Sequence, residues 1–385
     1  MKKIVMTMLA LIITLPSVSI AAKVKIGFVN SITGPEAPIG ENLTNGVALA
    51  LEDLKAKGID VELITEDDAG NPKKSMAALE KMVTRDRVVG IVGPYSSKCA
   101  NAIARLAEKC KVPLLIPVAS KDEITRQNLK WTFRLSATTQ DYAAILIDMA
   151  TSLGKPKTMA ILNENTEFGT SGAKAAKEYA AKKGIKIVAE DAYAPGYPDY
   201  RATLTKIKAK NPDLVFMVSY VADAILLMRQ SREVGLAPRA FLGAGAGFAT
   251  AAFARETAIS NNVFSSTQWT ENVTWPGAKT FSKRYSARFG KAPTYHAATA
   301  YESMMIMAET AAKSGGNQEK TRADLKSGQW TGIMGEVKFS DFEGYTNQNK
   351  HQMLVEQTHS GVHQTVYPPK YATSKAVYPF PGWKR

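Results

Sequence analysis

Short apolar runs alternate with amphipathic segments from residue 23 onward. Continuous apolar runs bounded by turn residues are typical of buried parallel strands, and apolar positions with a 3.6-residue period are typical of helices. The alternation predicts strands at residues 25–30, 60–66, 88–92 and 113–116, separated by helices at about 40–57, 72–85 and 97–110. This order of elements predicts an α/β fold with a parallel sheet.

A second series of the same kind follows Arg134. It predicts strands at 158–162, 185–190, 213–219, 240–243 and 263–266, and helices at 140–153, 168–183, 200–210 and 222–234. Helices at 277–289, 295–312 and 320–326 come next, then a final pair of strands at 335–339 and 352–357, and from about 367 an irregular tail rich in proline and aromatics. Two series of similar size predict two lobes, each a doubly wound open parallel sheet.

The first 22 residues have the layout of a secretory signal peptide. Lys2 and Lys3 precede an apolar run at residues 4–15, and small residues end the segment at Ala21-Ala22. The apolar run is too short to span a bilayer as a stable helix. No cysteine directly follows the predicted cleavage point. We therefore expect an exported mature chain with neither a lipid anchor nor a membrane span.

The formal net charge of +14 does not point to nucleic acid, because the lysines and arginines are dispersed over the predicted helices. They form no basic stripe and are not interleaved with aromatic residues, so a solvated basic surface is favoured. Cys99 and Cys110 fall on one predicted helix, about 16 Å apart by the helical rise. That separation excludes a disulfide between them.

Two hydroxyl-bearing turns follow neighbouring predicted strands. Ser96 and Ser97 come after the Gly93-Pro94 turn that ends the strand at 88–92, and Ser120 follows the strand at 113–116. Hydroxyls and free backbone N–H groups at a helix start attract an anion. The carboxyl ends of neighbouring parallel strands meet at one crevice, so the two turns predict a site for the acid end of a small ligand.

Three aromatic residues lie at predicted strand ends, where side chains can face a cleft: Phe168, Tyr220 and Trp269. Taken singly, each is more often packing in a core than contact with a ligand. Together with the hydroxyl turns, they predict a wall for an apolar or planar ligand body.

No known catalytic or cofactor motif is complete. The glycines at residues 243–247 fail the dinucleotide pattern because Phe248 stands at the third glycine position. Asp67-Asp68 does not continue as a calcium loop, and none of the four histidines has metal-ligand spacing. We find no grouping of nucleophile, base and orienting acid, so we expect no enzyme activity, cofactor or metal.

Residues along the whole mature chain match one known family in order and spacing. They are Lys25-Ile26-Gly27, Thr33-Gly34-Pro35, Asp67-Asp68 with Asn71-Pro72, Ile91-Val92-Gly93 with Ser96-Ser97, Pro113, Ala119-Ser120, Phe168-Gly169, Asn211-Pro212-Asp213 and Tyr220. Together with the signal peptide, they make the chain up to about Gln357 resemble the periplasmic leucine/isoleucine/valine-binding proteins of ATP-driven (ABC) importers.

The resemblance implies a type I periplasmic binding fold: two α/β lobes, joined by three crossings, that close on a ligand about a hinge. On that pattern, the signal peptide covers residues 1–22, one lobe comprises 23–140 and 268–345, and the other comprises 141–267 and 346–385. The family's disulfide is absent here, because its cysteine positions correspond to Gly70 and Ser96.

The resemblance also implies roles for particular residues. Ser97 and Ser120 would bind the ligand carboxylate, with the backbone of Ala119 beside them. Phe168 and Tyr220 would come from the opposite lobe. In the first loop, Ile39 occupies a position that contacts the ligand side chain.

One departure from the family concerns the other end of the ligand. Relatives that bind α-amino acids place an acid just past the strand at 240–243, and that position here is Gly245. A buried ammonium without a counter-charge costs several kcal/mol. Either Asp223 or Glu271 substitutes for the acid, or the ligand has no ammonium group.

These inferences predict a non-catalytic, monomeric solute-binding protein in the periplasm that delivers a small carboxylate to the membrane permease of an ABC importer. Branched-chain or other hydrophobic amino acids are the leading ligands, and non-amino organic or aromatic acids or amides are the alternative. An enzyme or a sensory ligand-binding protein is less favoured. A sensor would need a following membrane helix, and an enzyme would need a reacting group of residues.

Overall fold

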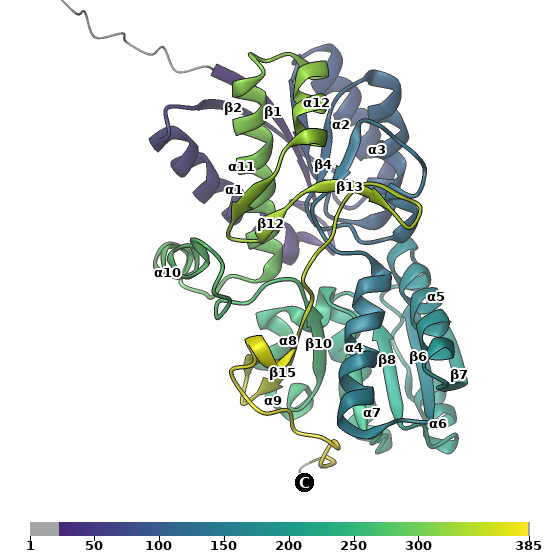
Figure 1. Ribbon diagram of the computed structural model, residues 1–385. Coiled ribbons are helices and arrows are strands. Elements are labelled where there is room, and N and C mark those ends of the chain that lie inside the picture. The colour runs from purple at the N-terminus through teal and green to yellow at the C-terminus, as the bar shows by residue number, and fades with distance from the viewer. Residues whose placement is uncertain (1–22, 384–385) are drawn as a thin grey trace, which may run out of the picture.

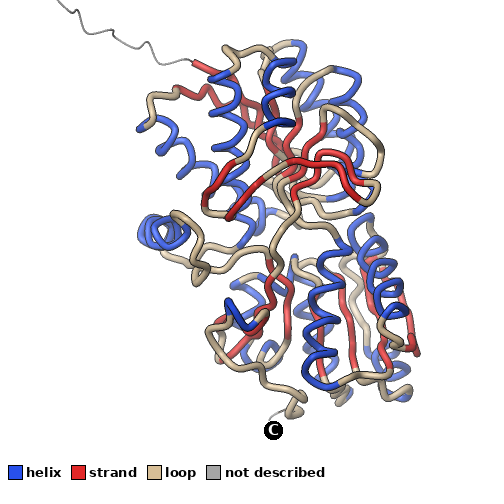
Figure 2. The backbone as a smooth tube through the Cα atoms, viewed as in Figure 1, coloured by secondary structure: helices blue, strands red, loops and turns tan. Residues whose placement is uncertain are grey.

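The computed structural model describes residues 23–383, so the predicted signal peptide at 1–22 lies outside the described residues. The described chain forms two lobes, each built on a seven-stranded sheet with helices on its faces (Figures 1 and 2). The sheets are mostly parallel, which confirms the predicted α/β class with two open-sheet lobes. No helix within residues 23–383 is both long and apolar enough to cross a membrane.

The sheet of the first lobe has the order β13-β14-β5-β4-β3-β1-β2. Its strands are β1 (Lys23–Asn30), β2 (Asp60–Asp67), β3 (Gly90–Val92), β4 (Leu114–Ile116), β5 (Thr132–Arg134), β13 (Phe339–Phe342) and β14 (Tyr345–Asn349). Its helices are α1 (Ala37–Ala56), α2 (Pro72–Thr84), α3 (Ser97–Cys110), α10 (Ala278–Phe289), α11 (Tyr295–Lys313) and α12 (Gln318–Ser327), with a 3-10 turn η1 (Asp122–Thr125). A small hairpin, β11 (Trp330–Gly332) and β12 (Gly335–Val337), completes the lobe.

The sheet of the second lobe has the order β16-β15-β10-β9-β8-β6-β7. Its strands are β6 (Thr158–Glu164), β7 (Lys186–Tyr193), β8 (Leu214–Val218), β9 (Ala240–Gly243), β10 (Phe264–Thr267), β15 (Leu354–His359) and β16 (Val362–Tyr367). Its helices are α4 (Thr139–Gly154), α5 (Glu167–Lys182), α6 (Arg201–Ala209), α7 (Val221–Val234), α8 (Ala251–Arg255) and α9 (Thr257–Ser260), with 3-10 turns η2 (Ala246–Ala249) and η3 (Pro369–Tyr371).

The continuous apolar runs are strands covered on both faces. Every residue of β3, β4 and β8 is buried. On the outside of the first sheet, α1 and α11 pack closely at Gly46, where a Cβ atom would lie 2.2 Å from the backbone oxygen of Ala297. Only glycine allows these two helices to approach so closely.

Within residues 23–383 the chain passes between the lobes three times: after β5, after β10 and between β14 and β15. The predicted return to the second lobe at residue 346 lies too early, because β14 pairs with β5 and keeps the chain in the first sheet through Asn349. The two final strands do not pair with each other either. Residues 335–337 pair with β11, whereas β15 lies in the other sheet between β10 and β16.

The aromatic tail packs on the second lobe. The Phe380 and Trp383 rings contact Phe241, with ring centroids 5.3 and 5.6 Å away. The Trp383 indole N–H donates to the Leu236 carbonyl at 2.8 Å. Cys99 and Cys110 are both free thiols, as predicted.

Candidate ligand-binding site

A cavity lies between the lobes, beyond the carboxyl ends of β3 and β4. Side chains from both lobes enclose it. The first lobe contributes Tyr95, Ser97, Val118, Ala119, Ser120 and Tyr295, and the second contributes Tyr142, Phe168, Tyr220 and Ala246. The two predicted hydroxyl turns therefore meet at one place.

The first turn places the Ser97 side chain at the cavity. Gly93 has φ +119°, and a Cβ atom there would lie 2.1 Å from the Val29 carbonyl oxygen, so the turn requires glycine. Helix α3 begins at Ser97, whose side chain is almost fully buried. The Lys121 backbone N–H donates to Ser97 Oγ at 3.2 Å. Because the oxygen already accepts this bond, the hydroxyl proton is free to be donated to a ligand oxygen.

The second turn, at Ala119 and Ser120, is held from behind by a buried guanidinium. Arg134 donates from Nη1 to the carbonyl oxygens of Ala119 and Lys121, at 3.3 and 2.6 Å. Its Nε donates to Gln348 Oε1 at 2.6 Å. The charge behind this turn favours an anion in front of it. The arrangement suits a carboxylate held by two serine hydroxyls.

Aromatic rings form the rest of the cavity wall. Phe168, at the start of α5, packs against Tyr220 with ring centroids 5.6 Å apart. Tyr220 also contacts Tyr95 of the opposite lobe, at 5.9 Å. Tyr142 and Tyr295 complete the set. A wall of tilted aromatic rings suits a planar or apolar ligand body.

The tyrosine hydroxyls make one part of the wall polar but uncharged. Burial raises the pKa of Tyr142 to about 12, so its hydroxyl keeps its proton at neutral pH. The Gln268 side-chain amide donates to Tyr142 Oη at 2.6 Å, and the Ala246 N–H donates to Tyr295 Oη at 3.1 Å. The Tyr95 hydroxyl is buried and has no hydrogen-bond partner among the described residues.

No carboxylate side chain of the described chain lines this cavity. Gly245 adjoins it: a Cβ atom there would lie 3.3 Å from the Tyr142 ring and 3.4 Å from the Tyr295 hydroxyl. Asp223, one predicted substitute, is buried outside the cavity, where it accepts from the Tyr200 hydroxyl at 2.8 Å and from the Gly196 N–H.

Glu164 is a carboxyl group behind the cavity wall. One of its oxygens accepts from the Tyr220 backbone N–H. Burial raises the pKa of Glu164 to about 8, so the group is largely protonated at neutral pH. It supplies no ready counter-charge for a ligand ammonium.

The structure brings together five of the predicted site residues: Ser97, Ala119, Ser120, Phe168 and Tyr220. Ser96 stands beside them at the N-cap position of α3, without a side-chain capping bond, and Gly245 precedes the lining residue Ala246. Four others do not line this cavity: Ile39 is buried in the first-lobe core, Asp223 lies behind the wall, and Trp269 and Glu271 line a second cavity.

Sequence reasoning missed five lining residues: Tyr95, Val118, Tyr142, Ala246 and Tyr295. Tyr95 and Val118 lie inside the two turns, so their position was a usable signal. Tyr142 and Tyr295 stand at helix starts, remote from either turn in the sequence, and no local pattern marks them.

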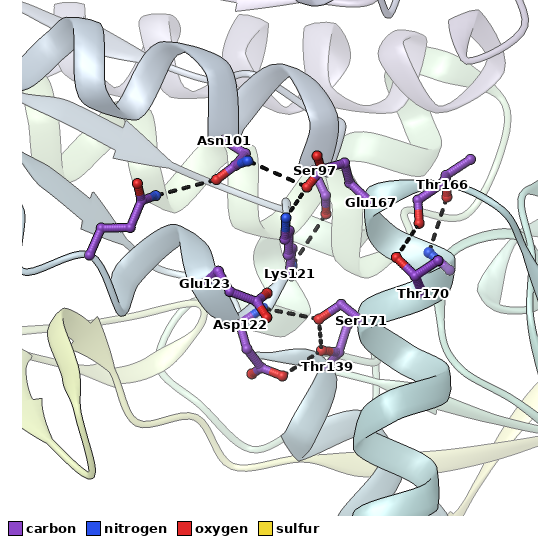
Figure 3. Close-up of polar contacts among 12 residues, drawn as sticks. Ser97, Asn101, Lys121, Asp122, Glu123, Thr139, Thr166, Glu167, Thr170 and Ser171 are labelled. Carbon is purple, nitrogen blue, oxygen red and sulfur yellow. Dashed lines mark hydrogen bonds and ion pairs between the residues drawn. The ribbon is translucent and has the colours of Figure 1, made fainter.

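A group of polar contacts links the lobes beside the Ser97 turn (Figure 3). Glu167 of the second lobe forms an ion pair with Lys121 of the first and accepts from Asn101 at 3.4 Å. The Asp122 N–H donates to Ser171 Oγ at 3.2 Å. These bonds hold α5 against the turn that carries Ser120.

The chain matches known proteins over nearly its whole described length. A family model described as periplasmic binding protein matches residues 23–361. A "Leu/Ile/Val-binding protein homolog 7" from Brucella suis is 27% identical, over 93% of this chain and 95% of that protein.

Two solved structures share the fold. A leucine-binding protein from Thermotoga maritima has a TM-score of 0.82 at 20% identity, covering 90% of this chain and 99% of that one. A solute-binding protein of an ABC transporter from Rhodopseudomonas palustris, in complex with 3,4-dihydroxybenzoic acid, has a TM-score of 0.81 at 22% identity, covering 93% and 99%.

Proposed function

This chain belongs to the periplasmic binding protein family, whose model matches residues 23–361, and on that basis we propose which class of ligand it binds. The protein captures a small carboxylate with a planar or apolar body between its two lobes. It then delivers that ligand to the membrane permease of an ABC importer. It acts in the periplasm as a monomer and does not transform its ligand.

The observation that carries this proposal is the composition of the cavity wall. Two serine hydroxyls stand at one place and five aromatic rings surround the remaining space, and no lining residue carries a formal charge. A carboxylate can be held by hydroxyls and by the positive charge of Arg134 behind the second turn. An ammonium would meet no counter-charge, at a cost of several kcal/mol. The geometry therefore favours aromatic and other non-amino carboxylic acids.

Branched-chain or other hydrophobic amino acids are the second candidate, because the Brucella suis relative that aligns over 95% of its length is named a Leu/Ile/Val-binding protein homolog. For such a ligand, Glu164 is the carboxyl group placed behind Tyr220. It would have to lose its proton when the ammonium arrives. Binding would then release a proton to the buffer, which calorimetry in buffers of different ionisation enthalpy detects.

A thermal-shift screen of the purified mature protein tests the proposal. The panel contains benzoate, 4-hydroxybenzoate and 4-methylpentanoate, and the three branched-chain amino acids. We expect the non-amino acids to raise the midpoint of unfolding because they bind the folded state only. Stabilisation by leucine, isoleucine or valine alone would overturn the preference for ligands without an ammonium group.

A further inference from the structure

A second cavity, larger than the first, adjoins it at one side chain. The first lobe contributes the loop at residues 292–295, and the second contributes α8, the end of β10 and the hairpin of β15 and β16. Two predicted ligand contacts, Trp269 and Glu271, lie here and not in the first cavity. Among the described residues, Tyr295 alone lines both cavities. The two spaces therefore meet at Tyr295.

Tyr295 is the bulky side chain at this boundary. The 3-10 turn η2 also runs past both cavities, with Ala246 lining the first and Ala249 lining the second. The side chains of these two residues are only methyl groups. The almost fully buried ring of Tyr295 therefore supplies the bulk that keeps the two spaces apart.

The Tyr295 ring is held at its face and at its tip. It stacks on the His296 ring, with centroids 3.9 Å apart and planes inclined by 27°. Its hydroxyl oxygen accepts the Ala246 N–H at 3.1 Å. Tyr295 belongs to the first lobe and Ala246 to the second, so this bond links the lobes. A ring that is packed and bonded in this way resists displacement by a ligand.

The second cavity offers apolar surface to any ligand that extends past this ring. Its charged lining residues are Arg255 and Glu271. An apolar extension of a ligand gains free energy when it leaves water for apolar side chains. The small or apolar lining residues are Ala249, Ala251, Ala254, Ala292, Pro293 and Val362.

We propose that Tyr295 limits the length of the ligand, by closing the carboxylate cavity off from the second cavity. The protein takes compact acids, which carry one aromatic ring or a short branched chain, and rejects acids extended by a second ring. This inference rests on the proposed function of the first cavity. The selectivity is steric, because an extended acid has to displace a packed ring, and overpacking a filled interior is costly.

Calorimetry with benzoate and biphenyl-4-carboxylate tests the proposal, because these two acids differ by one phenyl ring. The parent protein should bind biphenyl-4-carboxylate at least about tenfold more weakly than benzoate. Tyr295→Ala should bind biphenyl-4-carboxylate at least about tenfold more tightly than the parent does, because the second phenyl ring then enters the second cavity and leaves water. Thermal unfolding shows whether each variant is folded.

Two further variants serve as controls. Tyr295→Phe keeps the ring and loses only the bond from Ala246, so it should still reject biphenyl-4-carboxylate. Ala251→Phe places a ring at a residue that lines the second cavity and not the first. Alone, it should leave benzoate binding unchanged. Combined with Tyr295→Ala, it should cancel the gain in affinity for biphenyl-4-carboxylate.

Four results would overturn the proposal. They are equal binding of both acids by the parent, no gain in a folded Tyr295→Ala variant, an equal gain in Tyr295→Phe, and a gain that survives Ala251→Phe. The first comparison needs no variant, so it decides even if Tyr295→Ala does not fold.

Failure of the parent to bind benzoate would refute the proposed function and not the role of Tyr295. In that case L-phenylalanine and 4-phenyl-L-phenylalanine replace the two acids in the same comparison. Binding of the longer amino acid as tightly as the shorter one would overturn the role of Tyr295 as well.

Discussion

Removing the Ser97 hydroxyl should weaken carboxylate binding strongly. The hydroxyl lines the cavity, and its oxygen already accepts the Lys121 N–H at 3.2 Å, which leaves its proton for the ligand. A hydrogen bond to a charged group contributes about 1.5–3 kcal/mol. Ser97→Ala should therefore raise the Kd for benzoate roughly 10- to 150-fold. Isothermal titration calorimetry measures this change, and thermal unfolding shows whether the variant is folded.

The chain offers a matched control in the neighbouring residue. Ser96 is equally buried and its hydroxyl has no hydrogen-bond partner among the described residues, but it does not line the cavity. Ser96→Ala should leave the Kd within about twofold, since no bond to the ligand is lost. An unchanged Kd for Ser97→Ala, or an equal loss in both variants, would refute the assignment of the carboxylate to Ser97.

Three further predictions concern the contact between the lobes, the tail and pH. Glu167→Gln removes the partly exposed ion pair with Lys121. It should weaken benzoate binding about two- to fivefold at 50 mM NaCl and less at 500 mM, because salt screens the pair. A loss of affinity that does not depend on salt would contradict this. Phe380→Ala should lower the free energy of unfolding in urea by about 3 kcal/mol, because its ring is buried against the second lobe; a loss below about 1 kcal/mol would show that the tail packs loosely. Burial lowers the pKa of His296 to about 3. Below about pH 6.5 the unfolded chain therefore binds a proton at this histidine that the folded chain does not bind. The free energy of unfolding consequently decreases as the pH is lowered from about 6.5 toward 3. His296→Gln should remove ~2 kcal/mol of the loss between pH 6.5 and 4.5, and parallel urea-midpoint curves for parent and variant would contradict the assignment.

Local signals predicted the elements that carry the proposed anion site. Helix α3 spans Ser97–Cys110, as predicted, because its start is marked by the Gly93-Pro94 turn and its buried face by regularly spaced small and apolar residues. The turn at Ala119 and Ser120 was predictable for a similar reason, since it follows a short apolar strand.

The parts that the sequence could not predict depend on contacts between remote residues. β5 and β14 carry polar residues where the prediction required an apolar run. Arg134 Nε donates a hydrogen bond to Gln348 Oε1 at 2.6 Å, although 214 positions separate the two residues in the sequence. Tyr142 and Tyr295 reach the cavity only because the chain passes repeatedly between the lobes. Trp269 and Glu271 also follow the end of a strand, β10, but they line the second cavity and not the one between the serine turns.

The central claim is that the cavity holds a carboxylate and has no place for an ammonium. Calorimetry with ligand pairs that differ only in the amino group tests it most directly: 4-methylpentanoate against L-leucine, and 3-phenylpropanoate against L-phenylalanine. Because no lining residue offers a counter-charge, the account predicts that the acid without the amino group binds at least about 100-fold tighter in whichever pair fits. Tighter binding of the amino acid in either pair would contradict the account.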